Sequence, residues 1–148
     1  MGCSGSAAAN AGDSKPSSRK PTKGGKPVLG YWHIRAGPRG NLNRCLLHWA
    51  GVDFEDKRYL DVPAWKAEKE TLPMQHPNLP YLKHGDFWIS ESKVVPAYIC
   101  DTWAPELIGS GSPEMRARIL QIQEQLVENF MKGLSSVFMT EDRESCAK

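Results

Sequence analysis

This sequence lacks closely spaced cysteines, and that absence excludes one kind of chemistry. The 148 residues contain four cysteines, and none of them forms a Cys-x-x-Cys pair. Thiol-disulfide exchange needs a paired resolving thiol, so that activity is not expected. Apolar runs are short as well, and none is long enough for a signal peptide or a membrane span. Together these absences predict an intracellular protein in a reducing compartment.

Metal-ligand spacing and a basic surface are also missing. The four histidines are too scattered to bind a metal ion, so no metal is expected. The net charge is +2, but residues 1–26 carry +4 (five Lys/Arg against Asp13), which leaves −2 for the rest (14 Lys/Arg against 16 Asp/Glu). A slightly acidic body without a basic stripe does not attract nucleic acid, which is excluded as a partner.

What is present divides the chain into four parts. Residues 1–26 are rich in Gly, Ala, Ser, Lys and Pro and contain no aromatic residue, which predicts a disordered basic tail. Residues 27–108 carry the apolar and turn patterns of one folded domain. Residues 112–140 are expected to form one long helix, and residues 141–148 a flexible end.

Strand and helix signals alternate within residues 27–108. Strands are expected at 28–32, at 54–59 on an edge, and at 79–83 and 87–90, which form a hairpin about residues 84–86. A Gly/Pro-rich loop through Gly37, Pro38 and Gly40 precedes a helix at 42–49, and further helical segments are expected at 65–69 and 93–103. A loop over 105–111 follows. This order is that of a thioredoxin-like α/β layer.

Two helices carry more specific expectations. The apolar face of the helix at 42–49 is expected to contain Leu42, Cys45, Leu46 and Trp49. Cys45, like Cys100 in the helix at 93–103, is therefore interpreted as a buried, inert thiol.

The long helix has the clearest start. Ser112, Pro113 and Glu114 supply an N-cap, a proline at the first helical position and an acid in the first turn. The apolar residues after them form one stripe, interpreted as core or dimer surface: Met115, Ile119, Ile122, Leu126 and Phe130.

Three motifs stand at separations that together resemble one protein family. They are LGYWHIR at 29–35, PNLPYL at 77–82 with Trp65 and Lys69 upstream, and Glu91 with Ser92 before the third helix. In this combination the chain, from about residue 26 to 134, resembles the glutathione S-transferases, most closely their mu class. The resemblance implies a thioredoxin-like βαβαββα glutathione-binding domain, followed by the first helix of a truncated all-α C-terminal domain.

The resemblance also implies roles for individual side chains. In the family, the tyrosine that matches Tyr31 donates a hydrogen bond to the glutathione sulfur, which makes Tyr31 the candidate catalytic residue. Trp32, Trp65, Lys69 and Asn78 would hold the tripeptide. Without a ligand, Trp65 and Lys69 are also consistent with a packing residue and a solvated charge.

The remaining glutathione contacts would come from the backbone and from a helix N-terminus. Pro80 would form a cis peptide bond, which proline alone tolerates, and the bend would present the backbone of Leu79 to the ligand. Ser92 would bind the γ-glutamyl carboxylate, because N–H groups at a helix N-terminus attract an anion. Glu91 would face the amine of the ligand.

The sequence departs from the mu-class pattern at several places. The loop after the first strand is two residues longer, Val62 replaces an arginine that touches glutathione, and Leu126 replaces an aspartate that reaches the partner subunit's site. Only one helix of the second domain follows. These departures favour an alternative, a non-catalytic protein-interaction module. A second alternative, a membrane-tethered structural or adaptor protein, is favoured by the N-terminus.

The function that the resemblance implies is glutathione transfer. The protein would bind glutathione as its co-substrate and transfer the thiolate to an electrophilic small molecule, without a cofactor, as a homodimer or in a larger assembly. At the N-terminus, Gly2 and Ser6 fit an acceptor pattern for myristoylation, and Cys3 is a candidate for palmitoylation. The protein is thus predicted to be cytoplasmic. It would be anchored at the cytoplasmic face of a membrane if Gly2 is myristoylated and either a second acyl chain at Cys3 or the basic tail supplies the second attachment.

Overall fold

The fold is described from a computed structural model, which covers residues 24–33, 38–109 and 111–139. The expected lipidation sites Gly2 and Cys3, most of the tail at 1–26 and the end at 141–148 lie outside the described residues. Within the described part of the chain, no helix has the length and apolarity that a membrane span requires.

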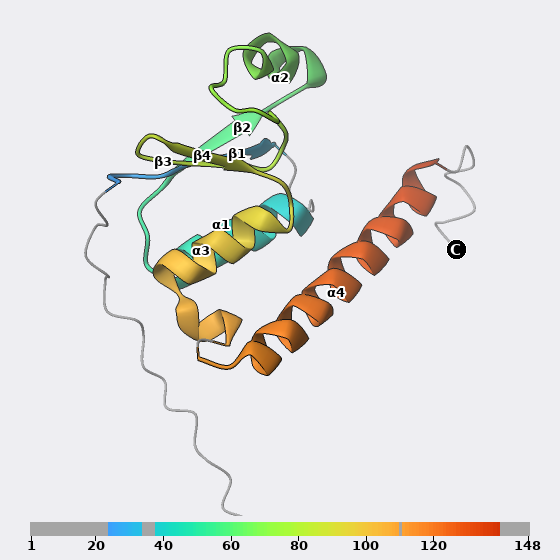
Figure 1. The fold of residues 1–148 in the computed structure, drawn as a ribbon. Helices are drawn as coiled ribbons and strands as arrows, with labels where there is room; N and C mark the ends of the chain where they lie inside the picture. The colour runs from blue at the N-terminus through green and yellow to red at the C-terminus, as the bar shows by residue number, and fades with distance from the viewer. Residues whose placement is uncertain (1–23, 34–37, 110, 140–148) are drawn as a thin grey trace, which may run out of the picture.

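Four strands form one mixed sheet in the order β2-β1-β3-β4 (Figure 1). They are β1 (Val28–Trp32), β2 (Glu55–Tyr59), β3 (Tyr81–His84) and β4 (Phe87–Ser90). β1 pairs in parallel with β2 and antiparallel with β3, and β3 pairs antiparallel with β4. The expected edge position of β2 and the expected hairpin are confirmed. β3 begins two residues later than expected, after Pro80, which has no N–H to donate to a ladder.

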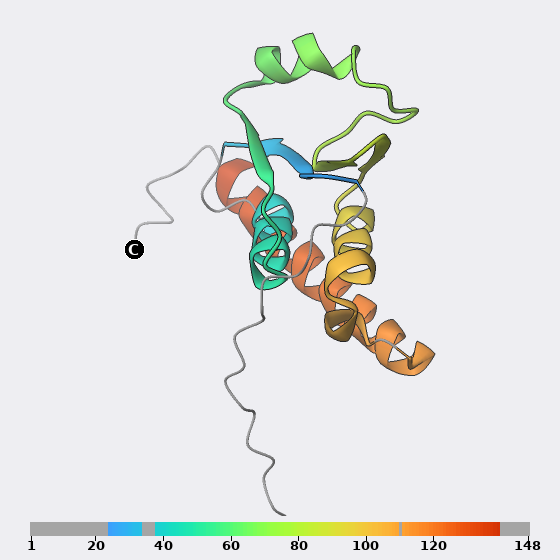
Figure 2. The ribbon, with the colours of Figure 1, turned by 90° about the vertical axis from the view of Figure 1, so that its left-hand side faces the viewer.

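Helices cover both faces of this sheet. The helices α1 (Pro38–Trp49) and α3 (Val94–Trp103) pack together on one face, and α2 (Val62–Lys69) lies beyond the other face (Figure 2). The main core lies between the sheet and α1 and α3, where five aliphatic side chains are fully buried: Leu29, Leu47, Leu82, Val95 and Ile99. Each contributes about 1.5–3 kcal/mol by leaving water. The thioredoxin-like βαβαββα order is confirmed.

The helix α1 differs from its sequence-based description. It begins at Pro38, within the expected loop, because proline is pre-organised for the first helical position, where no N–H is needed. Its buried face contains Asn43 and Arg44 together with Leu47, whereas Trp49 is exposed. The expectation of a buried Cys45 is wrong, since this thiol is exposed, while Cys100 is buried as expected. The apolar periodicity predicted the wrong buried face of α1, because hydrogen-bonded polar residues, Asn43 and Arg44, lie on the face that is buried.

A long helix, α4 (Pro113–Met139), follows a short 3-10 helix, η1 (Pro105–Ile108), that lies in the expected loop. The predicted cap is confirmed, because the Met115 N–H donates to Ser112 Oγ at 3.2 Å. Two ion pairs of 2.6 Å attach α4 to α3, and they join Arg116 to Asp101 and Lys93 to Glu124.

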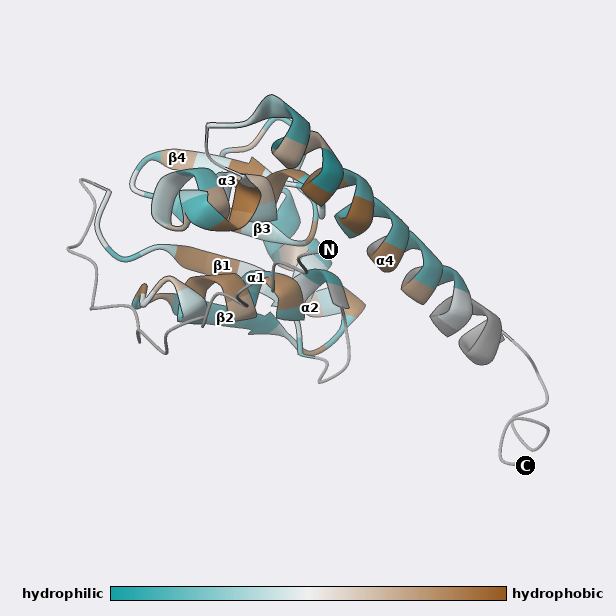
Figure 3. Ribbon diagram, turned by 90° about the horizontal axis from the view of Figure 1, so that it is seen from below, coloured by the Kyte–Doolittle hydropathy of each residue, from teal (hydrophilic) through white to brown (hydrophobic). Residues whose placement is uncertain are grey.

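The apolar side of α4 is turned toward α1 and α3 (Figure 3). A cavity of 470 Å³ separates these helices, and Leu42 and Leu46 of α1 and Ile119, Ile122 and Leu126 of α4 are among its lining residues. Leu126 is nevertheless 66% exposed. The stripe predicted from the sequence therefore faces the body of the protein without closing a core against it.

Candidate functional site

Three strand ends meet at one edge of the sheet. β1 and β3 run antiparallel with Gly30 opposite Tyr81, so Tyr31 follows at the edge where β3 starts. β4 ends at Ser90, opposite Tyr81. The Glu91 N–H donates to the Pro80 carbonyl at 3.1 Å. The peptide bond between Leu79 and Pro80 is cis, as expected. The fold thus gathers the end of β1, the Leu79–Pro80 bend and the start of α3.

Tyr31 is a buried phenol at this edge, with only 6% of its surface exposed. Its ring lies against the first turn of α1, where a Cβ on Gly40 would come within 2.1 Å of Tyr31 Cδ1. Burial raises the pKa of Tyr31, and the charges of Arg39 and Arg44 oppose this rise. The hydroxyl therefore keeps its proton at neutral pH and can act as a hydrogen-bond donor.

Arg44 belongs to a network that sequence reasoning missed. Its Nε donates to both carboxylate oxygens of Asp56 at 3.0 Å, and its Nη1 donates to Asn41 Oδ1 at 2.9 Å. Arg58 Nε also donates to Asp56, at 2.7 Å. The network ties α1 to β2, and no local spacing in the sequence announces it because its partners come from separate elements.

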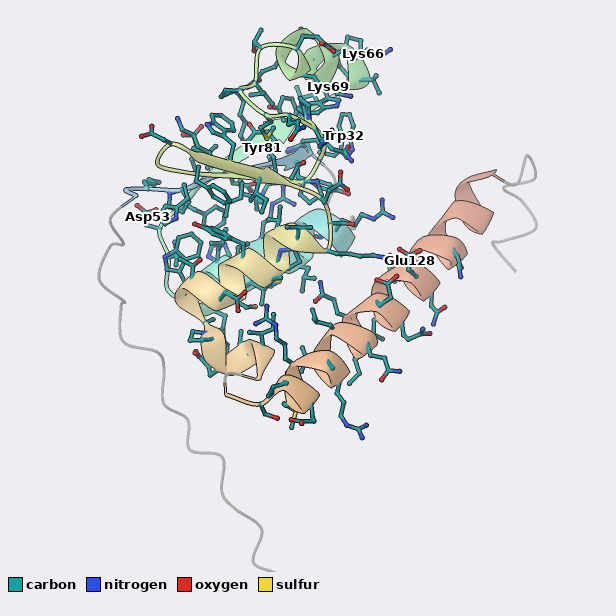
Figure 4. All side chains as sticks on the ribbon, in the orientation of Figure 1. Trp32, Asp53, Lys66, Lys69, Tyr81 and Glu128 are labelled. Carbon is teal, nitrogen blue, oxygen red and sulfur yellow. The ribbon has the colours of Figure 1, made fainter. Side chains whose placement is uncertain are left out.

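Trp65 and Trp32 lie on the α2 side of the sheet. Trp65 is buried, with its ring stacked 6.4 Å from that of Tyr81 and in edge contact with Tyr59 at 5.1 Å. Trp32 packs partly buried against the same cluster. Figure 4 shows Trp32 and Lys69 on the same side of the molecule. Trp65 thereby has the packing role that the sequence left open, and it supports the helix that carries Lys69.

Lys69, Asn78 and Glu91, three of the expected binding residues, line one polar cavity of 410 Å³. The Asn78 Nδ2 donates to Glu91 Oε1 at 2.8 Å, and the Leu79 N–H donates to Asn78 Oδ1 at 2.9 Å. Gln75 and His76 also line the cavity, and sequence reasoning did not select them.

Glu91 stands in an unusual backbone conformation just before α3. Its φ of +89° is a value that side chains other than glycine rarely adopt, and such outliers cluster at functional sites. Its carbonyl accepts from the N–H groups of Val94 and Val95, which starts the helix. Lys93 occupies the N-cap position without a side-chain cap, which leaves the first turn suited to an anion beside Ser92.

A metal site is not formed by the described residues, in which no group of three or more His, Cys, Asp or Glu side chains is placed to hold an ion. The chemistry that this edge of the sheet can perform is recognition of a polar, charged ligand and hydrogen bonding to an anion from Tyr31.

Comparisons with known proteins support a relationship over this part of the chain. The family described as glutathione S-transferase, N-terminal domain, matches residues 27–101. The glutathione S-transferase of Tyrophagus putrescentiae is 38% identical over 108 residues, which are 70% of this chain and 47% of that protein. Glutathione S-transferase Mu 4 of Mus musculus is 37% identical over 110 residues, 69% of this chain and 49% of that protein. The chain spans about half the length of these curated relatives.

Solved structures give the same picture. The glutathione S-transferase from Ascaris lumbricoides matches with a TM-score of 0.61 and 30% identity, over 76% of this chain and 51% of that one. The Pi-class glutathione S-transferase of Onchocerca volvulus matches with a TM-score of 0.66 and 20% identity, over 79% and 52%, which is a likeness of fold.

Proposed function

This chain belongs to the glutathione S-transferase family and has a mu-like N-terminal domain, and we propose that it binds glutathione and transfers the thiolate to electrophilic substrates. Glutathione is the co-substrate in this family, and no further cofactor is needed. The observation that carries the proposal is the meeting of Tyr31, the Leu79–Pro80 bend and the cavity of Lys69, Asn78 and Glu91 at one edge of the sheet.

The proposed chemistry depends on a neutral Tyr31 hydroxyl. Glutathione loses its thiol proton to solvent, and the Tyr31 O–H donates a hydrogen bond to the resulting sulfur anion. The anion then attacks an electrophilic carbon with a sulfur electron pair, which forms the C–S bond and displaces a leaving group or pushes electrons onto the substrate, where a proton from water adds. The thiolate is the nucleophile, so any stabilisation of the anion raises its population at neutral pH.

Ligand binding is proposed to use the polar cavity and the backbone beside it. Lys69 supplies a positive charge for a carboxylate of glutathione, Glu91 a negative charge for its amine, and Ser92 a hydroxyl for the γ-glutamyl carboxylate. The Leu79 N–H is already bonded to Asn78 Oδ1, so the Asn78 side chain turns away when the ligand takes that N–H. Trp32 and the aromatic cluster around Trp65 support the residues that line the polar cavity.

Residues 27–108 are proposed as the glutathione-binding domain, and residues 112–140 as the first helix of the second domain. A homodimer, a cytoplasmic location and acylation at Gly2 and Cys3 remain proposals that rest on the sequence. The alternative of a protein-interaction module draws on the exposed Val62 and Leu126. A measurement of glutathione binding distinguishes this alternative from the proposed transferase.

Calorimetry with glutathione tests the proposal. The full chain should bind glutathione, and Lys69→Ala should weaken binding by about 10- to 100-fold, since hydrogen bonds to charged groups contribute about 1.5–3 kcal/mol. Lys66→Ala is the matched control, because Lys66 lies on the same helix, is exposed and is not among the residues that line the cavity (Figure 4). Absence of heat at millimolar glutathione would refute the function.

A further inference from the structure

The cavity between α4 and the body of the protein has the lining of a site for an apolar chain. Its volume of 470 Å³ lies within the range of about 300–1,000 Å³ that is typical of small-molecule sites. The lining comes from α1, α3, η1 and α4, and apart from Gln123 and the Cys100 thiol the described residues in it are apolar. Water finds few hydrogen-bond partners in such a space, so an apolar ligand is the favourable occupant.

This cavity is open to solvent along α4. The side chains of Ile122, Leu126 and Phe130 line it, and each is at least half exposed. They belong to the apolar side of α4 that is turned toward α1 and α3 (Figure 3). An apolar chain can therefore enter from solvent and cover side chains that are otherwise left in water.

The N-terminus of the same molecule is a source of an apolar chain. Gly2 and Ser6 fit the acceptor pattern for myristoylation. Removal of Met1 leaves the Gly2 amine, which takes the acyl group from a coenzyme A thioester. An amide bond forms at the Gly2 nitrogen, and the coenzyme A thiol leaves with the proton that the amine loses.

The segment between Gly2 and the body is long enough to reach the cavity. Gly24, the first residue that the structure describes, comes 22 positions after Gly2. At about 3.3 Å per residue this segment extends as far as about 70 Å. A body of about 100 residues has a radius of gyration of only about 13 Å, so its whole surface is within reach. The charges favour contact too, because residues 1–26 carry +4 and the rest of the chain −2.

We infer that the cavity between α4 and the body shelters the myristoyl chain on Gly2 of the same molecule. The inference rests on the acylation proposed for Gly2 and does not depend on glutathione binding. A ligand on a flexible tether has an effective concentration of about millimolar, well above that of a second copy at micromolar concentration. The acylated chain therefore fills its own cavity, whereas the chain made without the acyl group leaves this face to a second copy.

Sheltering of the acyl chain controls membrane attachment. One myristoyl chain binds a membrane only weakly and reversibly. A cavity that competes for the same chain therefore withdraws the protein from the membrane, and the chain must leave the cavity before the protein can attach.

Vesicle binding of the full acylated chain tests this. The protein is made in bacteria together with an N-myristoyltransferase and is sedimented with phosphatidylcholine vesicles, whose zero net charge does not attract the basic tail. Ile122→Asp places a charge in the cavity lining at an exposed position of α4. It should raise vesicle affinity about tenfold or more, because a sheltered chain binds only in the fraction of molecules that expose it.

Leu120→Asp is the matched control. Leu120 lies on the same helix, is also exposed, and is not among the residues that line this cavity. The substitution adds the same charge and removes a similar side chain, so vesicle affinity should stay at the wild-type value. Circular dichroism verifies that both variants are folded.

Nuclear magnetic resonance locates the acyl chain directly. In the acylated wild-type protein, a ¹³C-labelled myristoyl group should give nuclear Overhauser effects to the methyl groups of Leu42 and Leu46, which line the cavity from α1. These effects should be lost in Ile122→Asp and kept in Leu120→Asp.

The outcomes separate the claims. A Gly2 that the transferase does not acylate overturns the proposed acylation and this inference together, and leaves the glutathione proposal untouched. An acylated, folded protein without Overhauser effects to Leu42 or Leu46, and with equal vesicle affinity in wild type and Ile122→Asp, overturns the inference alone. These effects in the wild type, with vesicle affinity raised by Ile122→Asp and not by Leu120→Asp, support it.

Discussion

The two cysteines of the described chain occupy opposite environments. Cys100 is buried in the wall of the cavity between α3 and α4, and burial, together with the nearby Asp101 and Glu106 carboxylates, raises the pKa of its thiol to about 11. The thiol is the neutral form below that value, and only the thiolate reacts.

Labelling of these cysteines is therefore expected to differ. Iodoacetamide at pH 8 should modify the exposed Cys45 well before Cys100. As the pH rises toward 11, the rate at Cys100 should increase about tenfold per unit, following its thiolate fraction. Peptide mapping by mass spectrometry gives both rates, and Cys100 labelled as fast as Cys45 at pH 8 would contradict the burial described here.

At this residue scale, sequence reasoning identified residues that line the polar cavity better than residues that hold the surrounding elements together. Lys69, Asn78 and Glu91 were selected by motif, and the fold brings them to one cavity. Arg44 was not selected, because a buried arginine is recognised only through partners such as Asp56, which stands 12 residues away on another element.

At the scale of single elements, two glycines inside helices should respond oppositely to alanine. Alanine stabilises a helix interior by about 0.5–1 kcal/mol relative to glycine. Gly133 in α4 has open space at its Cβ position, so Gly133→Ala should stabilise the protein by this amount. In α1 the added Cβ of Gly40→Ala would come within 2.1 Å of the Tyr31 ring, and such overpacking costs about 1–3 kcal/mol.

Urea unfolding of the two alanine variants measures this difference. The midpoint should fall for Gly40→Ala and rise for Gly133→Ala. A rise for both would show that the first turn of α1 does not pack on Tyr31 and would weaken the placement of the candidate site.

Element boundaries were predictable where a local signal decides them. β1 and the start of α4 were predicted correctly, since an apolar run and the Ser112 cap act within a few residues. The start and the buried face of α1 were not predicted. Gly40 lies there because the Tyr31 ring of β1 leaves no room for a side chain, and Arg44 is buried because it pairs with the Asp56 carboxylate of β2. Tertiary contacts there override the loop and periodicity signals.

At the scale of the whole molecule, α4 leaves apolar surface uncovered. Ile122 and Leu126 are 57% and 66% exposed beside the cavity of 470 Å³. Burial of even a few hundred Å² at about 25 cal/mol per Å² is worth several kcal/mol, a large fraction of the stability of a small domain. We therefore expect the chain to associate with a second copy through this face.

Sedimentation velocity at micromolar concentration measures that association. The wild-type chain should sediment as a dimer or larger species, and Leu126→Asp should shift it toward the monomer. Leu60→Asp is the matched control, because Leu60 is 78% exposed between β2 and α2 and does not line the α4 cavity. A well-folded wild-type monomer would show that α4 closes the fold without a partner.

The central claim is that Tyr31 stabilises the thiolate of bound glutathione. Ultraviolet titration of the complex should give a thiol pKa below the value of about 8.5 for a free thiol. Tyr31→Phe should return that pKa toward the free value while glutathione affinity stays within about twofold, because the hydroxyl acts mainly on the charged form. A bound thiol that titrates identically in wild-type and Tyr31→Phe protein would contradict the account.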